Sequence, residues 1–404
     1  MSKLKALPPL ALYVHIPWCV RKCPYCDFNS HERTDALPEH EYVAKLMLDL
    51  EALLPKVWGR RLVSIFIGGG TPSLFSPGAI DTLLAGVRAR LTLDPSAEIT
   101  LEANPGTVEA AHFRGFRDAG VNRISIGVQS FDERMLGALG RIHSAHEARR
   151  AIDAALESFD NVNIDLMYGL PGQTLDMARA DIEEAARSGV PHISAYQLTI
   201  EPNTVFWSRP PPLPAHDECA DMQLRAEEIL QRGGYEHYET SAFAKALHRC
   251  QHNLNYWEFG DYLGIGAGAH GKISFPDRIT RHERIKQPRD YLMSTNTVAG
   301  EKTVPVDDLP FEFMLNALRL VEGFSPALFE ERTGLPLMVI ERKLQKAEEA
   351  GLLERDWSRI RPTERGQRFL NELLALFLSD GTPDPAADAP GGGRVIRISS
   401  SASR

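Results

Sequence analysis

Short apolar segments that alternate with helix-like stretches run through the first 200 residues of the chain. Strands that alternate with helices pair in parallel, because the helix supplies the long crossover that two parallel strands need. The right-handed crossover rule then leaves a doubly wound sheet or a full or partial barrel, which periodicity alone does not separate. In both folds, ligands bind at the carboxyl ends of the strands. The predicted strands are 11–16, 62–67, 98–102, 123–128, 162–167 and 192–200, and the predicted helices between them include 40–54, 77–90, 108–118 and 145–158.

The alternation ends near residue 240, and the rest of the chain has a different character. The glycine- and aromatic-rich stretch 252–271 is predicted to form packed loops rather than an exposed linker. Beyond residue 305, helical patterns and a short hairpin over 352–362 predict a small winged-helix arrangement, with helices over 309–321, 325–332, 336–350 and 363–378. The middle helix mixes acidic and basic residues and lacks the basic stripe of a DNA reader. An interaction or lid domain is therefore expected.

These patterns divide the chain into four parts. Its 404 residues, 43% of them hydrophobic, suffice for a large core domain with an appendage. Residues 1–240 are predicted to form the core domain, 241–304 a connecting segment and 305–378 a C-terminal domain. The composition of residues 379–404 cannot bury enough apolar surface for an ordered structure, so a disordered tail is expected.

Charge and hydropathy restrict the partners of the chain. Lys and Arg total 45 against 54 Asp and Glu, and the formal net charge of -9 argues against nucleic acid as a partner. No stretch reaches the roughly 18 to 20 apolar residues that a membrane-spanning helix requires, and the first residues lack the apolar region of a signal peptide. The expected location is the cytoplasm, with no membrane span.

Three of the five cysteines fall within eight residues, in the spacing CxxxCxxC. Pro17 and Pro24 disfavour a helix here, so a loop is expected. Three thiolates leave one iron of a cubane iron–sulfur cluster open for a substrate or cofactor, whereas structural zinc takes four closed ligands. A zinc site completed by His15 or His31 is the alternative. The predicted metal ligands are Cys19, Cys23 and Cys26, and the isolated Cys219 and Cys250 are assigned no role.

A glycine run and several polar residues stand where predicted strands end. Glycines 68–70 lack a Cβ, so their backbone can approach a ligand and present amide donors to it. Neither GK[ST] nor GxGxxG is present at this run, so it carries no motif for binding a nucleotide triphosphate or a dinucleotide. The polar residues, which are expected to converge above one barrel mouth, are Glu102, Gln129, Arg141 and Asp165.

Longer stretches of the chain match a known family. The segment HIPWCVRKCPYCDFNSH at 15–31 resembles the signature of the radical S-adenosylmethionine (SAM) family, in which SAM chelates the open iron of a 4Fe-4S cluster. This resemblance covers nearly all of the chain up to about residue 378. It implies a partial (β/α)6 TIM-like radical SAM barrel followed by a small, mainly helical, winged-helix-like domain of the HemN type. The other matching motifs are GGGTPS at 68–73, EANP at 102–105, NRISIGVQSF at 122–131, GRIHS at 140–144, NIDLMYGLPGQT at 163–174 and HNLNYW at 252–257.

The same resemblance implies a SAM site beside the cluster. Gly70 and Thr71 match contacts to the aminoacyl end of SAM. In the related coproporphyrinogen oxidases, further positions contact the cluster-bound SAM, and these match Tyr13, Glu102, Gln129, Arg141 and Asp165. The implied cofactors are a 4Fe-4S cluster on the three cysteines and SAM.

A third ligand is implied by the motif HNLNYW, which resembles the HNxxYW motif of the haem-chaperone subgroup of this family. Imidazole is a standard haem ligand, so His252 could bind haem iron while Tyr256 and Trp257 line a flat apolar ligand. A packing role for His252 is the alternative. Cys250 precedes it as CxH and not as CxxCH, so covalent haem attachment has no support from the sequence.

Three functions are compared. The preferred one is a haem chaperone that retains cluster and SAM, binds haem and transfers it to acceptor haem proteins, with respiratory membrane enzymes as candidate acceptors. The alternative is an oxygen-independent coproporphyrinogen III oxidase, whose motif continues as CxxxCxxCxC, but Phe28 replaces the extra cysteine here. A winged-helix regulator would require a basic recognition face, which the sequence lacks. No catalytic residue is assigned, and whether the chain is an enzyme stays open.

Overall fold

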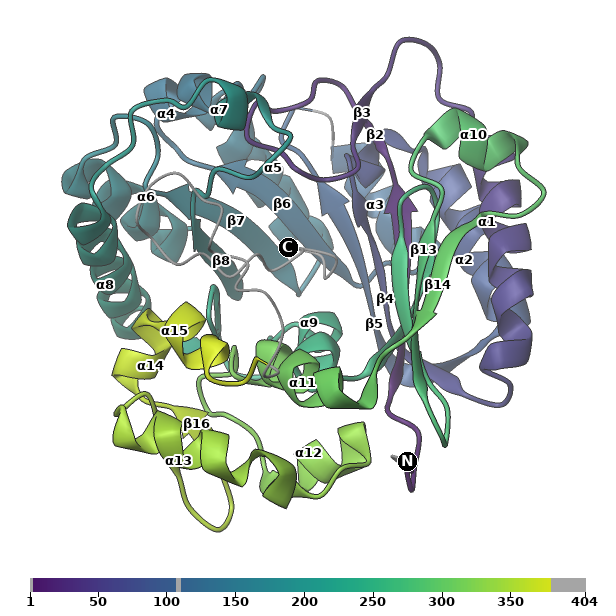
Figure 1. The fold of residues 1–404 in the computed structure, drawn as a ribbon. Helices are drawn as coiled ribbons and strands as arrows, with labels where there is room; N and C mark the ends of the chain where they lie inside the picture. Colours follow the sequence, from purple (N-terminus) through teal and green to yellow (C-terminus); the bar gives the residue numbers. More distant parts are fainter. Residues whose placement is uncertain (1–2, 107–109, 379–404) are drawn as a thin grey trace.

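The computed structural model describes residues 3–106 and 110–378. All six predicted strands are present, and they lie side by side, parallel and in chain order. The sheet is open and ends at β14 on one side and β9 on the other, so it forms a partial barrel (Figure 1). The six strands are β1 (Leu10–Ile16), β4 (Arg61–Gly69), β5 (Thr92–Ala103), β6 (Arg123–Gln129), β7 (Val162–Tyr168) and β8 (His192–Gln197).

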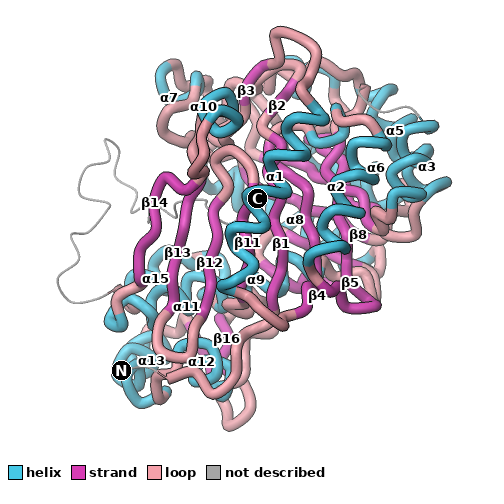
Figure 2. The backbone as a smooth tube through the Cα atoms, turned by 90° about the vertical axis from the view of Figure 1, so that its right-hand side faces the viewer, coloured by secondary structure: helices cyan, strands magenta, loops and turns pink. Residues whose placement is uncertain are grey.

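Helices follow these strands and cover the outer face of the sheet, as Figure 2 shows for α1 and α2. Their bounds are α1 (Glu39–Leu53), α2 (Pro77–Arg90), α3 (Ala110–Ala119), α5 (Ala145–Ser158), α6 (Leu175–Arg187) and α8 (His216–Arg232). In α2 the buried residues Ile80, Leu83, Leu84 and Val87 follow the helical repeat, and they pack into the main hydrophobic core. The predicted helices over 40–54, 77–90 and 145–158 are confirmed, whereas the start predicted for the helix over 108–118 lies outside the described residues.

The stretch 252–271 is not the set of packed loops that the sequence predicts. This part of the chain forms α9 (Gln251–Trp257), β11 (Asp261–Ile265) and β12 (His270–Ser274), followed by β13 (Ile279–Arg284) and β14 (Val298–Thr303). Strand β11 is buried throughout and pairs in parallel with β1. Glycine belongs inside this strand, because a Cβ on Gly264 would meet the carbonyl oxygen of His270 at 1.8 Å. The glycine that suggested a loop is therefore required by the close packing of β11 against β12.

The remaining elements complete the two ends of the sheet and the connections. Antiparallel strands β10 and β9 extend it beyond β8, so the sheet includes strands from both sides of residue 240. The predicted boundaries of the connecting segment at 241 and 304 stay predictions. These elements are β2 (Trp18–Cys19), β3 (His31–Glu32), η1 (Leu54–Lys56), η2 (Pro72–Leu74), α4 (Glu133–Ala138), α7 (Val205–Ser208), β9 (Glu236–Glu239), β10 (Ala242–Ala244), α10 (Pro288–Met293) and η3 (Val306–Asp308).

The C-terminal region is mostly helical and has a hydrophobic core of its own. It comprises α11 (Leu309–Ala317), α12 (Pro326–Thr333), η4 (Leu337–Ile340), α13 (Glu341–Glu349), β15 (Leu353–Arg355), β16 (Ile360–Pro362), α14 (Glu364–Arg368) and α15 (Leu370–Ala375). The predicted hairpin is present, but the single helix predicted over 363–378 is two helices, because Phe369 leaves the helical conformation with φ -109° and ψ 43°. The predicted tail lies outside the described residues. Within residues 3–106 and 110–378, no helix has the length and hydropathy needed to cross a bilayer.

A buried ion pair ties the first helix to the added strands. The Nε of Arg284 in β13 lies 2.7 Å from Asp49 Oδ1 in α1, and neither side chain is more than 1% exposed. Asp49 also accepts hydrogen bonds from Tyr291 OH, Thr297 Oγ1 and the amide of Gly266. One carboxylate thus holds four segments together.

We predict that Arg284→Met destabilises the protein by about 3–5 kcal/mol, because the charge of Asp49 would stay buried without its cationic partner. Arg361→Met is the matched control, since Arg361 pairs with Glu354 where both side chains are more than half exposed. Its cost should stay below about 1 kcal/mol. Equilibrium denaturant unfolding measures both values, and equal costs for the two variants would contradict the role of Asp49.

Candidate cofactor site

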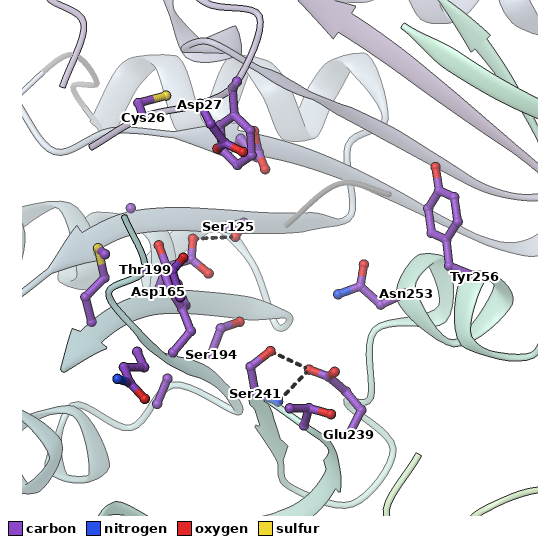
Figure 3. Close-up of a pocket in the computed structure, with 18 of the residues that line it drawn as sticks. Cys26, Asp27, Ser125, Asp165, Ser194, Thr199, Glu239, Ser241, Asn253 and Tyr256 are labelled. Atoms are coloured by element: carbon purple, nitrogen blue, oxygen red, sulfur yellow. Dashed lines mark hydrogen bonds between the residues drawn. The ribbon is translucent and has the colours of Figure 1, made fainter. Parts of the chain in front are cut away.

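The carboxyl ends of the parallel strands open into a cavity of about 690 Å³. The cysteine loop and strand ends line one part of it, and α9, α11, α14 and α15 contribute to the rest. Figure 3 shows Cys26 and Asp27 at one side of the cavity, Asp165 and Ser194 in the middle, and Glu239 toward the opposite side. The cavity therefore spans the space between the barrel mouth and the C-terminal region.

The three clustered cysteines face this cavity together. Cys19, Cys23 and Cys26 are half-buried and line it, whereas Cys219 and Cys250 are buried and do not. The base of the loop is fixed by parallel pairing of β2 with β3. Burial raises the pKa of Cys19 to about 11 and also raises that of Cys26, so metal binding must displace thiol protons. Three sulfurs on one cavity wall suit a cluster that keeps one iron open.

The alternative zinc site finds no support in the two histidines proposed for it. His15 Nε2 donates to the carbonyl oxygen of Asn29 at 2.9 Å, and its Nδ1 accepts from Tyr13 OH at 2.9 Å, so both ring nitrogens are occupied. His31 Nε2 lies 3.3 Å from Asn29 Oδ1. Among the described residues, no three His, Cys, Asp or Glu side chains are arranged to hold a single metal ion.

The amides of Gly69, Gly70 and Thr71 are bonded within the protein and are not free for a ligand. The amide of Gly69 donates to Glu102 Oε2 at 3.0 Å, that of Gly70 to the oxygen of Ile16 at 2.8 Å, and that of Thr71 to the oxygen of Trp18 at 2.7 Å. The expectation of free amide donors is therefore wrong for these residues. Gly70 and Thr71 do line the cavity, beside Cys19.

Two half-buried carboxylates stand at the barrel mouth. Burial, with a smaller contribution from the charge of Asp165, raises the pKa of Glu102 to about 8. Burial also raises the pKa of Asp165, although Ser125 Oγ and Asn163 Nδ2 donate to it at 3.2 and 2.9 Å. Both carboxylates line the cavity, so a bound cation such as the ammonium of SAM would favour their ionised forms.

Arg141 and Gln129 are held beside the cysteines by polar contacts. Arg141 Nη2 donates to Asn104 Oδ1 at 2.7 Å and to the oxygen of Gly127 at 2.6 Å, while its Nη1 approaches Cys23 Sγ at 3.7 Å. Gln129 ends β6 with φ 71°, a left-handed conformation that costs a non-glycine residue about 1 kcal/mol or more. This conformation, rather than a continued strand, sets the direction of its side chain.

The structure brings further residues to the site that the sequence analysis did not select. Asn104 Nδ2 donates to Thr71 Oγ1 at 2.8 Å, so Asn104 connects the glycine run to Arg141. Tyr196 OH donates to Gln129 Oε1 at 2.8 Å and lines the cavity. Asn104 stands inside the matched EANP motif, which was the available signal, whereas Tyr196 carries no motif.

Tyr13 is the predicted SAM contact that does not line the main cavity. It lines a smaller cavity of about 330 Å³, next to the first, which it shares with His15, Cys26, Gly69 and Glu102. Burial raises the pKa of Tyr13, with a further contribution from the charge of Glu102. The smaller cavity adjoins the main one, because Cys26, Gly69 and Glu102 line both.

His252 is fully buried and does not line either cavity. Its Nδ1 lies 2.9 Å from Ser64 Oγ, and its ring stacks on Phe66 and meets the edge of Tyr256. The Nε2 atom has no hydrogen-bond partner among the described residues. In this arrangement the ring packs α9 against β4, and haem iron could reach it only if α9 moved. The ligand role of His252 stays a prediction.

The helix that carries the motif is capped from the barrel. The N-cap residue Cys250 makes no side-chain cap, and Glu98 of β5 takes that place. Its carboxylate accepts from the amides of Gln251 and His252, each at 3.1 Å. Tyr256 and Trp257 at the other end of α9 line the main cavity, as predicted for aromatic residues beside a flat ligand.

Comparison with known proteins gives the family. Residues 13–185 match the radical SAM superfamily, and residues 304–369 match the HemN C-terminal domain. A protein of Escherichia coli named heme chaperone HemW is 52% identical over 379 residues, which cover 93% of this chain and 99% of that protein. The chain belongs to the HemW family of radical SAM proteins. The protein of the same name from Haemophilus influenzae is 49% identical with the same coverage.

The fold comparison agrees with this assignment. The solved structure of coproporphyrinogen III oxidase (HemN) from Escherichia coli superposes with a TM-score of 0.77, covering 92% of this chain and 90% of that one. Its sequence identity is 22%, so the likeness concerns the fold. The predicted partial barrel with a mainly helical C-terminal region is confirmed. As members of the radical SAM family bind a 4Fe-4S cluster and SAM, these two cofactors follow from the family.

The burial of His252 generates a pH prediction. Desolvation lowers the pKa of His252 to about 3, below its ordinary value of 6.5, so the unfolded chain binds this proton first as the pH falls. Stability from this residue is therefore present above pH 6.5 and lost progressively toward pH 3. His252→Phe should reduce the loss of unfolding free energy between pH 7.5 and pH 5 by about 2 kcal/mol. Denaturant unfolding at both pH values tests this, and equal losses would show that His252 is not enclosed.

Proposed function

We propose that this protein is a haem chaperone, which binds haem together with a SAM-ligated 4Fe-4S cluster and transfers haem to acceptor haem proteins. The observation that carries the proposal is the 52% identity, over nearly the full length of both chains, to a protein named heme chaperone. A cavity of about 690 Å³ that joins the barrel mouth to the C-terminal region supports it, because small-molecule sites are concave and of this size.

The cluster is held by Cys19, Cys23 and Cys26, which line one wall of the cavity. When bound, a 4Fe-4S cluster with three protein ligands supplies one open iron for the amino and carboxylate groups of SAM. The half-buried carboxylates of Glu102 and Asp165 favour a cation in this position. The further SAM contacts are Tyr13, Gly70, Thr71, Gln129 and Arg141, and the position of all but Tyr13 on the same cavity supports them.

Haem occupies the part of the cavity between α9 and the C-terminal helices. Tyr256 and Trp257 offer aromatic faces there, and Phe369, which is 47% exposed, lines the opposite wall. Aromatic rings stack favourably on a flat macrocycle. His252 becomes the axial ligand if α9 moves and opens the ring to the cavity. The enclosure of this ring argues for a packing role, so haem affinity after its substitution decides between the two.

The cysteines bear on the location of the protein. None of the five cysteines, all of which lie within the described residues, forms a disulfide, which is typical of a reducing compartment such as the cytoplasm. A chaperone that releases haem requires haem proteins as acceptors, and we include respiratory membrane enzymes among the candidates. Pull-down of haem-loaded protein from cell extract, followed by the absorption spectrum of the recovered partner, tests this step.

The cysteine assignment predicts the metal content of variants. After anaerobic reconstitution the wild type should contain about four irons and four sulfides per chain. Each of the three thiolates is expected to ligate one iron of the cluster. Cys19→Ala, Cys23→Ala and Cys26→Ala should therefore each lose the cluster. Cys219→Ala and Cys250→Ala are the matched controls and should keep it.

Iron and sulfide analysis measures these outcomes, and zinc without sulfide, or loss of iron in a control variant, would reject the ligand set. Electron paramagnetic resonance of the reduced cluster then tests SAM. A spectrum that SAM leaves unchanged would contradict binding at the open iron. Arg141→Ala should weaken the SAM-induced change while the cluster stays in place.

Haem titration of the reconstituted protein, combined with a coproporphyrinogen turnover assay on the same sample, tests the function as a whole. We expect a Soret band that saturates with haem and no porphyrinogen decarboxylation, because Phe28 stands where the oxidase motif has its extra cysteine. Transfer of the bound haem to an apo-haem protein should follow. Sustained decarboxylation would reject the chaperone and establish the oxidase.

A further inference from the structure

Two buried hydrogen-bond donors in the cavity wall have no acceptor among the described residues. They are Nε of Arg319, which follows α11, and Nε1 of Trp257 at the end of α9. Both residues line the main cavity, and Trp257 is only 8% exposed. The guanidinium of Arg319 lies 4.3 Å from the centre of the Trp257 ring, so the two donors are neighbours. A buried donor without an acceptor is unfavourable, and an entering acceptor would relieve this cost.

Two other cations that line the cavity, Lys272 and Arg281, are already engaged. Lys272 donates to Asp261 and to two backbone oxygens, and Arg281 donates to Glu312 and Tyr262. Arg123 also has an unpartnered Nε, but it lies on the barrel floor 3.9 Å from Glu98. Arg319 is therefore the cavity cation that stands beside a second unpartnered donor.

The acidic neighbour of Arg319 leaves donors free. Glu239 Oε2 accepts from Arg319 Nη2 at 3.1 Å, and Glu239 Oε1 accepts from the amide and hydroxyl of Ser241 at 3.2 and 3.0 Å. A guanidinium carries five N–H donors in a planar fork, so one contact to Glu239 does not exhaust it. The acceptor that matches a guanidinium next to an indole N–H is a carboxylate.

We propose that Arg319 and Trp257 form a carboxylate subsite that binds a propionate of haem. The inference rests on the proposed function and adds how the cargo is oriented: the macrocycle is anchored by its acidic edge at the junction of α9 and α11. Arg368, at the end of α14, lines the same cavity and makes no hydrogen bond or ion pair with the described residues. Its positive charge would attract the propionate side of haem.

The test compares haem with its dimethyl ester, in which both carboxylates are blocked and the iron and ring are kept. Both ligands are titrated in the same detergent into wild-type protein and into the double variant Arg319→Gln with Glu239→Gln, which removes the cation without leaving a buried unpaired carboxylate. Wild type should bind haem at least about tenfold more tightly than the ester, as expected for a charge-assisted hydrogen bond. The double variant should bind both ligands with the affinity of wild type for the ester.

The matched control is Arg249→Gln with Glu322→Gln. This pair also bridges the barrel and the C-terminal region, but Arg249 does not line the cavity. It should keep the wild-type preference for haem. Trp257→Phe retains an aromatic ring and removes the indole donor, so its preference for haem over the ester should fall a few-fold. If the double variant does not fold, Trp257→Phe tests the subsite in its place.

The outcomes are distinguishable. A double variant, or in its absence Trp257→Phe, that keeps the full preference for haem over the ester would overturn the carboxylate subsite and leave the chaperone function standing. Wild-type protein that binds neither ligand would overturn the proposed function and the subsite together. The subsite would also be overturned if the Arg249 control lost its preference for haem over the ester. The loss would then be caused by disturbing the contact between the barrel and the C-terminal region, and not by removing a carboxylate-binding group.

Discussion

The cofactor cavity depends on backbone hydrogen bonds between the glycine run and the start of the cysteine loop. The amides of Gly70 and Thr71 donate to the oxygens of Ile16 and Trp18, and a Cβ at Gly70 would meet the Trp18 oxygen at 2.5 Å. Only glycine allows this approach. Cys19 follows directly from the bonded residue, so the parallel register of β1 and β4 fixes where the cysteine loop leaves the sheet.

A single strand couples this cysteine region to the motif HNLNYW. Residues four apart in a strand share a face, so Glu98 and Glu102 of β5 both project into the barrel. Glu102 accepts from Gly69 at the strand end, and Glu98 caps α9 through the amides of Gln251 and His252. The position of Tyr256 and Trp257 in the cavity therefore follows from the same strand that supports the glycine run.

Local patterns predicted the six parallel strands, because each is apolar and followed by a helix. They failed for α9 and β11, since α9 takes its cap from Glu98 far away in the sequence and β11 needs Gly264 where it meets β12. The cysteines, glycines and carboxylates of the cavity were found from motifs and strand ends. Tyr196 was not, because only the folded barrel brings it to Gln129. The enclosure of His252 likewise depends on Ser64 and Phe66 in another strand, which the motif does not contain.

The cavity has two ends with different chemistry. Cys26 and Asp27 lie at one side and Glu239 and Ser241 toward the other, with Asp165 between them (Figure 3). The first end offers thiols and half-buried carboxylates, which suit metal and the ammonium of SAM. The second end offers an arginine stacked on an indole, which suits an acid. A haem held by its propionates at the second end extends its ring toward the first, so the cysteine loop and the cargo occupy separate parts of one cavity. In this proposed arrangement, release of haem does not require displacement of the thiols that line the other end.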